Sequence, residues 1–310
     1  MPSDFRSDAI AYRRYARPTL AMTVLAAAIT TAPIAALAQT ASQVTPPTFR
    51  PLASSGGVTI GTPEQAPLQA PAEATGLSVQ VASVRVVGLF PELAEDAARI
   101  TRRAQGRRLT VAQLYEIASA IEQLHVSAGY VLARVIVPPQ EVVDGGTFNL
   151  EVIDGFIEAV NGDAIPERVR HAVMSRVESL VDVRHITLAE IERRVLLAGD
   201  VPGIQLASTL ARGSKRGGTK LILQAVYDPV QGTLVSDNRL NSALGGWQHT
   251  ASVSVNSMLG LGEQAYGTIA GSGDVLSEDS RLKMYAAGLV IPLGRDGLSF
   301  NPEYTLTRST

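Results

Sequence analysis

The chain has 310 residues, with 27 Lys and Arg against 29 Asp and Glu, so its formal net charge is −2 at pH 7. This balance provides no basic face of the kind that nucleic acid binding requires, and we expect no nucleic acid partner. The chain contains no cysteine, which excludes disulfides, thiolate zinc sites and cysteine nucleophiles. Its four histidines have no partner at metal-ligand spacing, and no set of nucleophile, acid and base emerges. The sequence therefore predicts a protein that is not an enzyme and that holds no metal and no cofactor.

The amino terminus has the pattern of an export signal. A basic leader with four arginines up to Arg17 precedes an uncharged, alanine-rich stretch from Leu20 to Ala38. This pattern, ending in the small residues Ala36-Leu37-Ala38, predicts a cleavable signal peptide over residues 1–38. Thr30, Thr31 and Pro33 dilute the stretch, which argues against a membrane-spanning helix and against a buried core helix. Residues 39–77 are rich in proline and read as a linker, because proline removes backbone donors and leaves little to bury.

Residues 78–155 read as one small α+β domain. An alternating stretch predicts a strand over Val79–Phe90, and a helical patch follows over Glu92–Ala104. Thr110 and Gln113 form a capping-box pair at the start of a helix whose apolar face runs to Leu124. Two extended segments around Asp144-Gly145-Gly146 then predict a hairpin, because glycines accept the positive φ that hairpin turns need.

The same order of elements repeats in residues 156–228. A short strand over Phe156–Val160 precedes a helix with Pro166 in its first turn. A second helix is capped by Thr187 and Glu190, and two strands follow over Ile204–Ala211 and Thr219–Tyr227. Two copies of about 75 residues suit two small modules, each with helices on one face of a sheet.

After Asp228 the pattern changes to period two. Apolar residues alternate with small polar ones over residues 247–256 and again over 300–307, with a poorer version over 281–291. This is typical of membrane barrel strands, with one side facing lipid and the other the lumen. A soluble antiparallel sheet with one solvent-exposed face has the same period of two and stays an alternative. About five strands are expected between Gly232 and Thr310, too few to close a pore, so we expect a chain truncated within a barrel.

Three motifs together resemble a known family. They are the stretch GYVLARVIVPPQ at 129–140, VDGGT at 143–147 and LEVIDG at 150–155. This run is similar to the first POTRA domain, of the ShlB type, in two-partner secretion transporters, the outer-membrane exporters of haemolysins and filamentous adhesins. Ser236-Asp237-Asn238 is similar to the start of the first barrel segment in that family.

The resemblance implies a fold and an activity. The fold class would be α+β, with tandem POTRA domains of β-α-α-β-β order over 78–155 and 156–228, followed by the first strands of a transmembrane antiparallel β-barrel over 229–310. Such a protein resides in the outer membrane with its POTRA domains in the periplasm. Its partners would be outer membrane lipid and an unfolded exoprotein, which it recognises and translocates through the barrel.

Strand physics suggests where the exoprotein binds. An extended client can pair with an exposed sheet edge through backbone hydrogen bonds, which tolerate many side chains. The predicted strand Tyr130–Val137 is the candidate edge, since Pro138 and Pro139 end it, and the helix Val111–Leu124 would flank it. The candidate client-binding residues are Tyr130, Val131, Ala133, Arg134, Val135, Gln113 and Glu116. The alternative is that these residues only build the domain core.

Two other functions stay open on the sequence alone. An outer-membrane protein assembly factor also combines POTRA domains with a barrel. A periplasmic POTRA scaffold without transport activity is the third reading, and it would leave residues beyond 232 soluble without detergent.

Overall fold

The computed structural model describes residues 60–61, 68, 70–72, 77–273 and 280–309. All of them belong to the compact unit Thr48–Thr310. The predicted signal peptide, residues 1–38, and most of the predicted linker lie outside the described residues.

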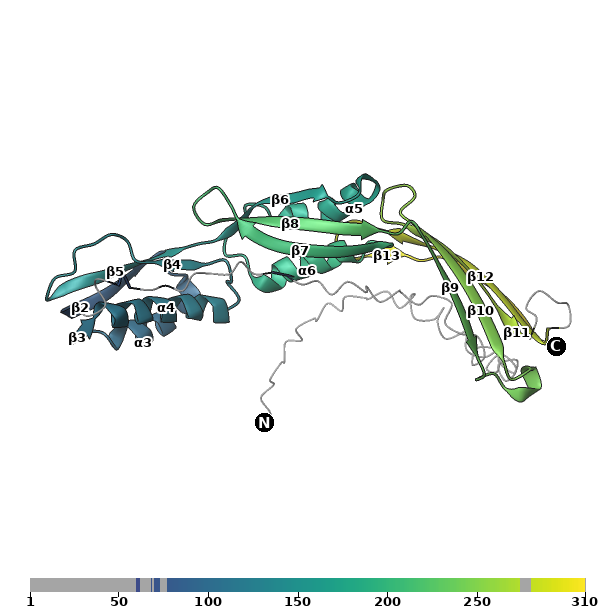
Figure 1. The fold of residues 1–310 in the computed structure, drawn as a ribbon, viewed down its shortest axis with the longest axis horizontal. Helices are drawn as coiled ribbons and strands as arrows, with labels where there is room; N and C mark the ends of the chain where they lie inside the picture. Colours follow the sequence, from purple (N-terminus) through teal and green to yellow (C-terminus); the bar gives the residue numbers. More distant parts are fainter. Residues whose placement is uncertain (1–59, 62–67, 69, 73–76, 274–279, 310) are drawn as a thin grey trace, which may run out of the picture. The chain divides into compact units, whose positions relative to one another are not determined.

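The first domain is a four-stranded sheet with helices on one face (Figure 1). Its elements are β2 (Ser78–Val87), η1 (Pro91–Leu93), α3 (Ala94–Arg102), β3 (Arg107–Thr110), α4 (Val111–Ser127), β4 (Arg134–Ile136) and β5 (Gly146–Ile153). The strand order is β3-β2-β5-β4, in which only the central β2–β5 pair is parallel. The core contains Leu114 and Ile121 from α4 and Leu150 from β5, each fully buried. The short strand β3 was not predicted, because its charged start, Arg107-Arg108, hides the extended pattern.

The predicted start of α4 is confirmed. The Thr110 hydroxyl accepts the Gln113 N–H at 3.2 Å, and the Gln113 side chain accepts the Thr110 N–H at 2.9 Å. This reciprocal capping box satisfies two backbone donors that the first helical turn leaves without partners. The helix ends before Gly129, whose φ of 95° only glycine adopts readily.

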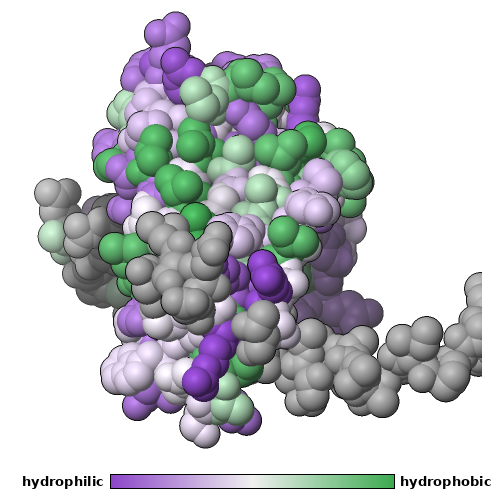
Figure 2. Space-filling view, turned by 90° about the vertical axis from the view of Figure 1, so that its right-hand side faces the viewer, coloured by the Kyte–Doolittle hydropathy of each residue, from purple (hydrophilic) through white to green (hydrophobic). Residues whose placement is uncertain are grey.

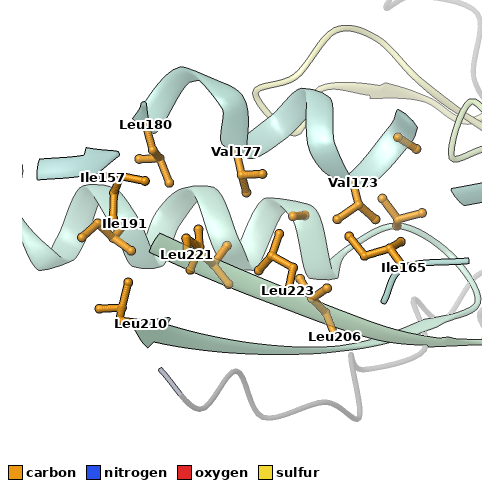
Figure 3. Close-up of a cluster of buried hydrophobic side chains, with 14 of the residues drawn as sticks. Ile157, Ile165, Val173, Val177, Leu180, Ile191, Leu206, Leu210, Leu221 and Leu223 are labelled. Atoms are coloured by element: carbon orange, nitrogen blue, oxygen red, sulfur yellow. The ribbon is translucent and has the colours of Figure 1, made fainter. Parts of the chain in front are cut away.

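The second domain repeats the plan. Its elements are β6 (Phe156–Ala164), α5 (Glu167–Val177), η2 (Glu178–Leu180), α6 (Leu188–Gly199), β7 (Ile204–Arg212) and β8 (Gly218–Tyr227). The second capping box is also confirmed, with Thr187 accepting from Glu190 N–H at 3.3 Å. Figure 3 shows the core, in which Val173 and Val177 of α5 and Ile191 of α6 meet leucines from β7 and β8. The helices thus cover one face of the sheet, as the repeat predicts.

A strand from the predicted linker joins the second sheet. The two-residue strand β1 (Ile60–Gly61) pairs in parallel with β7, so the full order is β1-β7-β8-β6. The proline-rich composition of residues 39–77 gave no expectation of a strand. Here Ile60 pairs with Ser208, 148 positions further along the chain (208 − 60), and local sequence patterns do not encode such a pairing.

The remaining residues form an antiparallel meander. Its elements are β9 (Val230–Asp237), η3 (Ser242–Leu244), β10 (Gln248–Asn256), β11 (Gln264–Ser272), β12 (Leu282–Pro292), β13 (Ser299–Phe300) and β14 (Glu303–Ser309). Each of the strands β9 to β12 pairs with its successor or predecessor, and β14 pairs with β12. The predicted strand over 300–307 is divided, because Asn301-Pro302 separates β13 from β14 and proline cannot donate to a ladder.

The register of the meander separates two kinds of side chain. One row across five strands is mostly large and apolar, namely Leu234, Ala251, Ile269, Tyr285 and Leu306. The adjacent row is small and mostly polar, namely Thr233, Ser252, Thr268, Ala286 and Thr305. Leu234 is 86% exposed and Leu306 is 55% exposed, so the apolar row lies on the surface. Seen from the side on which β9–β12 lie in Figure 1, the surface carries patches of apolar residues (Figure 2).

An exposed apolar row of this kind is costly in water and is what a lipid-facing strand presents. Within the described residues, no helix combines the length and the apolar character needed to cross a membrane.

Hydrogen bonds of the buried residue Asn256 connect the meander to the second domain. Asn256, at the end of β10, is fully buried, and its amide donates to the Asp228 carbonyl at 3.0 Å. Its backbone carbonyl accepts the Tyr227 hydroxyl at 2.5 Å, and its side-chain oxygen accepts from Gln264 at 2.8 Å. These bonds satisfy the polar groups of a residue that would otherwise be expensive to bury.

Candidate functional site

The strand β4 is an edge of the first sheet, but it is shorter than predicted. It covers only Arg134–Ile136 and pairs with β5 through Arg134↔Ile153, Val135↔Val152 and Ile136↔Glu151. The prediction of a strand beginning at Tyr130 is wrong, because residues 130–133 form a turn after α4. In that turn the Ala133 N–H donates to the Tyr130 carbonyl at 3.1 Å.

The outward side of β4 is already occupied by a helix side chain. The Val135 N–H donates to Glu122 Oε2 of α4 at 2.8 Å and does not join the ladder with β5. Arg134 Nη1 lies 3.8 Å from Glu122 Oε1. Burial lowers the pKa of the Arg134 guanidinium, and the Glu122 charge partly opposes this shift. In a three-residue antiparallel strand only one N–H faces outward, so Glu122 covers the donor that a client strand would need.

Sequence reasoning missed Glu122. Its half-buried position beside the core residue Ile121, which calls for a polar partner, becomes visible only in the structure. The partner lies 13 residues away, and helical spacing does not reveal it.

Three other predicted site residues support the domain structure instead. Val131 packs against the core of the second domain, with its neighbour Leu132 buried in that same core. Ala133 and Val135 are buried in the core of the first domain. The segment after α4 is therefore divided between two cores, and the alternative that these residues build the structure holds for their side chains.

The turn also joins the two domains through the backbone. The Gly129 carbonyl accepts the Leu188 N–H at 2.8 Å, at the first residue of α6. The Phe90 ring lies 4.1 Å from the His185 ring and 4.8 Å from the Tyr130 ring, measured between centroids. Residues 129–132 are thus part of the joint between the domains.

Tyr130 is fixed by a hydrogen bond at this joint. Its hydroxyl donates to Glu92 Oε1 at 2.6 Å. This bond lowers the pKa of the Glu92 carboxyl and raises the pKa of the Tyr130 phenol. The Tyr130 side chain therefore has a structural partner and does not lie along β4.

The two predicted residues of α4 have different environments. The Gln113 side chain is engaged in the capping box in the first turn of α4. The residue of α4 that contacts β4 is Glu122, further along the same helix. Glu116 is exposed and lines an open depression of about 450 Å³ on α4. The other lining residues are Leu68, Ala70, Ala112, Tyr115, Ser119, Ala120 and Gln123. The structure therefore brings Arg134 and Val135 together at the edge, while Glu116 belongs to a separate surface.

No group of three or more His, Asp or Glu side chains is arranged to hold a metal ion in the part of the chain that the structure describes.

Comparisons with known proteins bear on the first domain and on the whole fold. Residues 79–155 match the family described as POTRA domain, ShlB-type. The heme/hemopexin transporter protein HuxB of Haemophilus influenzae strain 86-028NP is 26% identical over 176 residues, which are 55% of this chain and 30% of HuxB. HuxB of strain Rd is 25% identical over the same extent. The chain thus matches less than a third of the length of these curated relatives.

A solved structure extends the likeness. CdiB from Escherichia coli aligns with a TM-score of 0.59 and 21% identity, over 79% of this chain and 45% of CdiB. At this identity the likeness concerns the fold. Together these comparisons confirm two predictions, the resemblance to two-partner secretion transporters and the fold class of tandem POTRA domains followed by barrel strands.

Proposed function

We propose that this chain is the periplasmic and first barrel part of an outer-membrane transporter of two-partner secretion. It recognises an unfolded exoprotein of haemolysin or adhesin type through its POTRA domains, and the exoprotein then crosses the membrane through the barrel. The ShlB-type POTRA match at residues 79–155 is the observation that carries this proposal. The HuxB similarity supports it, since HuxB is by name a transporter.

The environments of the chain fit the same proposal. The exposed apolar row of the meander suits the lipid of the outer membrane, and the two α+β domains suit the periplasm. Export there would need the signal peptide predicted over residues 1–38. We propose no catalytic role, because transport of an unfolded chain along sheet edges needs backbone pairing and no reactive group.

Within the first domain we propose the edge at Arg134 and Val135 as a client contact that Glu122 controls. A client strand binding there must displace the Glu122 carboxylate from the Val135 N–H. Before a client binds, the Glu122 carboxylate takes the place of a strand carbonyl as acceptor for the Val135 N–H, and so keeps the edge from pairing with other proteins. Tyr130, Val131, Ala133 and Gln113 would contribute by holding the fold, and Glu116 would contribute through the separate depression on α4.

The test is binding of the amino-terminal secretion region of a haemolysin- or adhesin-type exoprotein in its unfolded form. The labelled region, diluted from denaturant, is added to the full chain in detergent, and fluorescence anisotropy reports the affinity. We expect saturable binding of the unfolded region, and Glu122→Ala should strengthen it about tenfold. The exposed Glu95 of α3 supplies the control, since Glu95→Ala also removes a carboxylate from the first domain but should leave the affinity unchanged. Absence of binding to every variant would overturn the proposed function and favour an assembly factor or scaffold.

A further inference from the structure

The apolar face of the meander also carries a row of polar and cationic side chains. This cationic row contains one residue from each of five paired strands, namely Ser236, His249, Gly271, Lys283 and Arg308. On every strand it lies two residues from the apolar row of Leu234 to Leu306. Side chains two residues apart share one face of a sheet, so the cationic row runs beside the apolar row at a distance of about 7 Å.

The cationic row lies at the end of the sheet that is remote from the second domain. The strand β9 begins at Val230, directly after the Asp228-Pro229 step that ends the second domain. Ser236 follows six residues after Val230 (236 − 230), which is about 20 Å along an extended strand. With the POTRA domains in the periplasm, this end of the strands reaches the outer leaflet of the outer membrane.

The two strong cations of the row have no counter-charge in the described residues. Lys283 of β12 and Arg308 of β14 are directly opposite each other, and like charges in that position weaken strand pairing. Neither side chain forms a salt bridge within the part of the chain that the structure describes. The acidic side chains of the five strands are Asp237 and Glu303, and the alternation of the strands places both on the opposite face. An external anion would therefore relieve the repulsion between the two cations.

The surroundings of this pair suit the phosphate of a lipid. Opposite residues of neighbouring strands have Cβ atoms about 5 Å apart, so an ammonium and a guanidinium group can reach the same phosphate. Tyr285 and Leu306 lie on the same face next to the cations and are exposed, which offers apolar surface to acyl chains. Trp247, directly before β10, is exposed as well, and tryptophan is typical of the membrane interface.

We propose that Lys283 and Arg308 form a binding site for the phosphate of a phosphorylated lipid of the outer leaflet, which in this membrane is lipopolysaccharide. The phosphate bridges the Lys283 ammonium and the Arg308 guanidinium, and the acyl chains lie along Tyr285 and Leu306. The bound lipid thereby stabilises the pairing of β12 with β14. This inference rests on the proposed function for the side of the membrane that the row reaches.

The test is lipid binding by the full chain in neutral detergent, with diphosphorylated lipid A as the probe. Trp247 is the single tryptophan of the chain, so its fluorescence reports binding at this end of the meander. We expect affinity for lipid A at least about tenfold above that for the dephosphorylated lipid, with a preference that falls as salt is added. Inorganic phosphate should not compete. Equal affinity for the two lipids, or competition by inorganic phosphate at the concentration of the lipid, would overturn the site.

Lys283→Glu separates lipid binding from folding. It turns the like-charged pair into an ion pair with Arg308, so we expect a higher melting temperature together with an affinity for lipid A at least about tenfold lower. Lys283→Arg keeps the charge and should bind like wild type. The matched control is Lys220→Glu, which makes the same charge change at an exposed lysine of β8 in the second domain and should also bind like wild type. Wild-type affinity in Lys283→Glu would overturn the proposal.

Binding of the unfolded exoprotein region separates this site from the proposed function. Wild type that binds that region but shows no preference for phosphorylated lipid overturns the lipid site and leaves the transporter function standing. That result is expected where the cations pair instead with carboxylates of residues 274–279, which lie outside the described residues. A lipid preference that Lys283→Glu abolishes, in a chain that binds no exoprotein region, supports the lipid site and overturns the proposed function.

Discussion

The Val135 N–H of β4 donates a 2.8 Å hydrogen bond to the Glu122 carboxylate of α4. A helix thus supplies the acceptor that a neighbouring strand would otherwise provide. The sheet edge of the first POTRA domain is closed by one side chain, and a single substitution should open it.

Glu122→Ala should expose the Val135 N–H. We expect its amide to exchange faster with solvent, and the free energy of unfolding to fall by about 1–3 kcal/mol, since a hydrogen bond to a charged group is lost. Glu122→Gln is the matched control, because its amide oxygen still accepts, and it should lose less. Hydrogen exchange followed by mass spectrometry or NMR measures the effect. An unchanged exchange rate in Glu122→Ala would contradict the bond.

Tyr130→Phe should make the stability less dependent on acid. The Tyr130 hydroxyl holds the Glu92 pKa below its usual 4.5, so this bond stabilises the fold above that pH and is lost as pH falls through the lowered value. We therefore expect wild type to melt at a higher temperature than Tyr130→Phe at pH 7. The difference should shrink as the pH falls through the lowered pKa of Glu92. A difference that stays constant with pH would mean that the bond to Glu92 contributes nothing.

Asn256→Ala should loosen the end of β10. The substitution leaves the Asp228 carbonyl and the Gln264 amide without their partner, at a cost of about 2–4 kcal/mol for the buried groups. Limited proteolysis near Asp228 in detergent should become faster. Asn256→Asp keeps the shape but turns a donor into an acceptor facing a carbonyl, so it should behave like Asn256→Ala. Wild-type cleavage rates in both variants would show that the side-chain hydrogen bonds of Asn256 are dispensable.

A chain ending at Asp228 should be a soluble monomer after removal of residues 1–38, whereas a chain extending to Thr310 should require detergent. The exposed apolar row from Leu234 to Leu306 and the open strand edges cause the difference. Light scattering after gel filtration without detergent distinguishes the two chains. Replacing Leu234, Ile269 and Leu306 by Asn should improve the solubility of the longer chain, and Thr233→Ala, Thr268→Ala and Thr305→Ala serve as controls on the other face. A dispersed monomer of the longer wild-type chain would favour the soluble sheet over the barrel.

The local sequence determined most of the elements. Both capping boxes, at Thr110 and Thr187, lie where the sequence predicts, because a cap is formed by residues three positions apart. The repeated order of elements and the period-two strands after Asp228 are also readable, since each depends on neighbouring residues. The domain limits drawn from these patterns stay predictions.

The tertiary structure alone decided the candidate site. Whether β4 is free depends on Glu122, and whether Val131 lies on an edge depends on the second core, into which it packs. The pairing of Ile60 with Ser208 joins residues almost 150 positions apart. Backbone pairing uses groups that every residue carries, so it leaves little trace in the side chains from which a sequence is read.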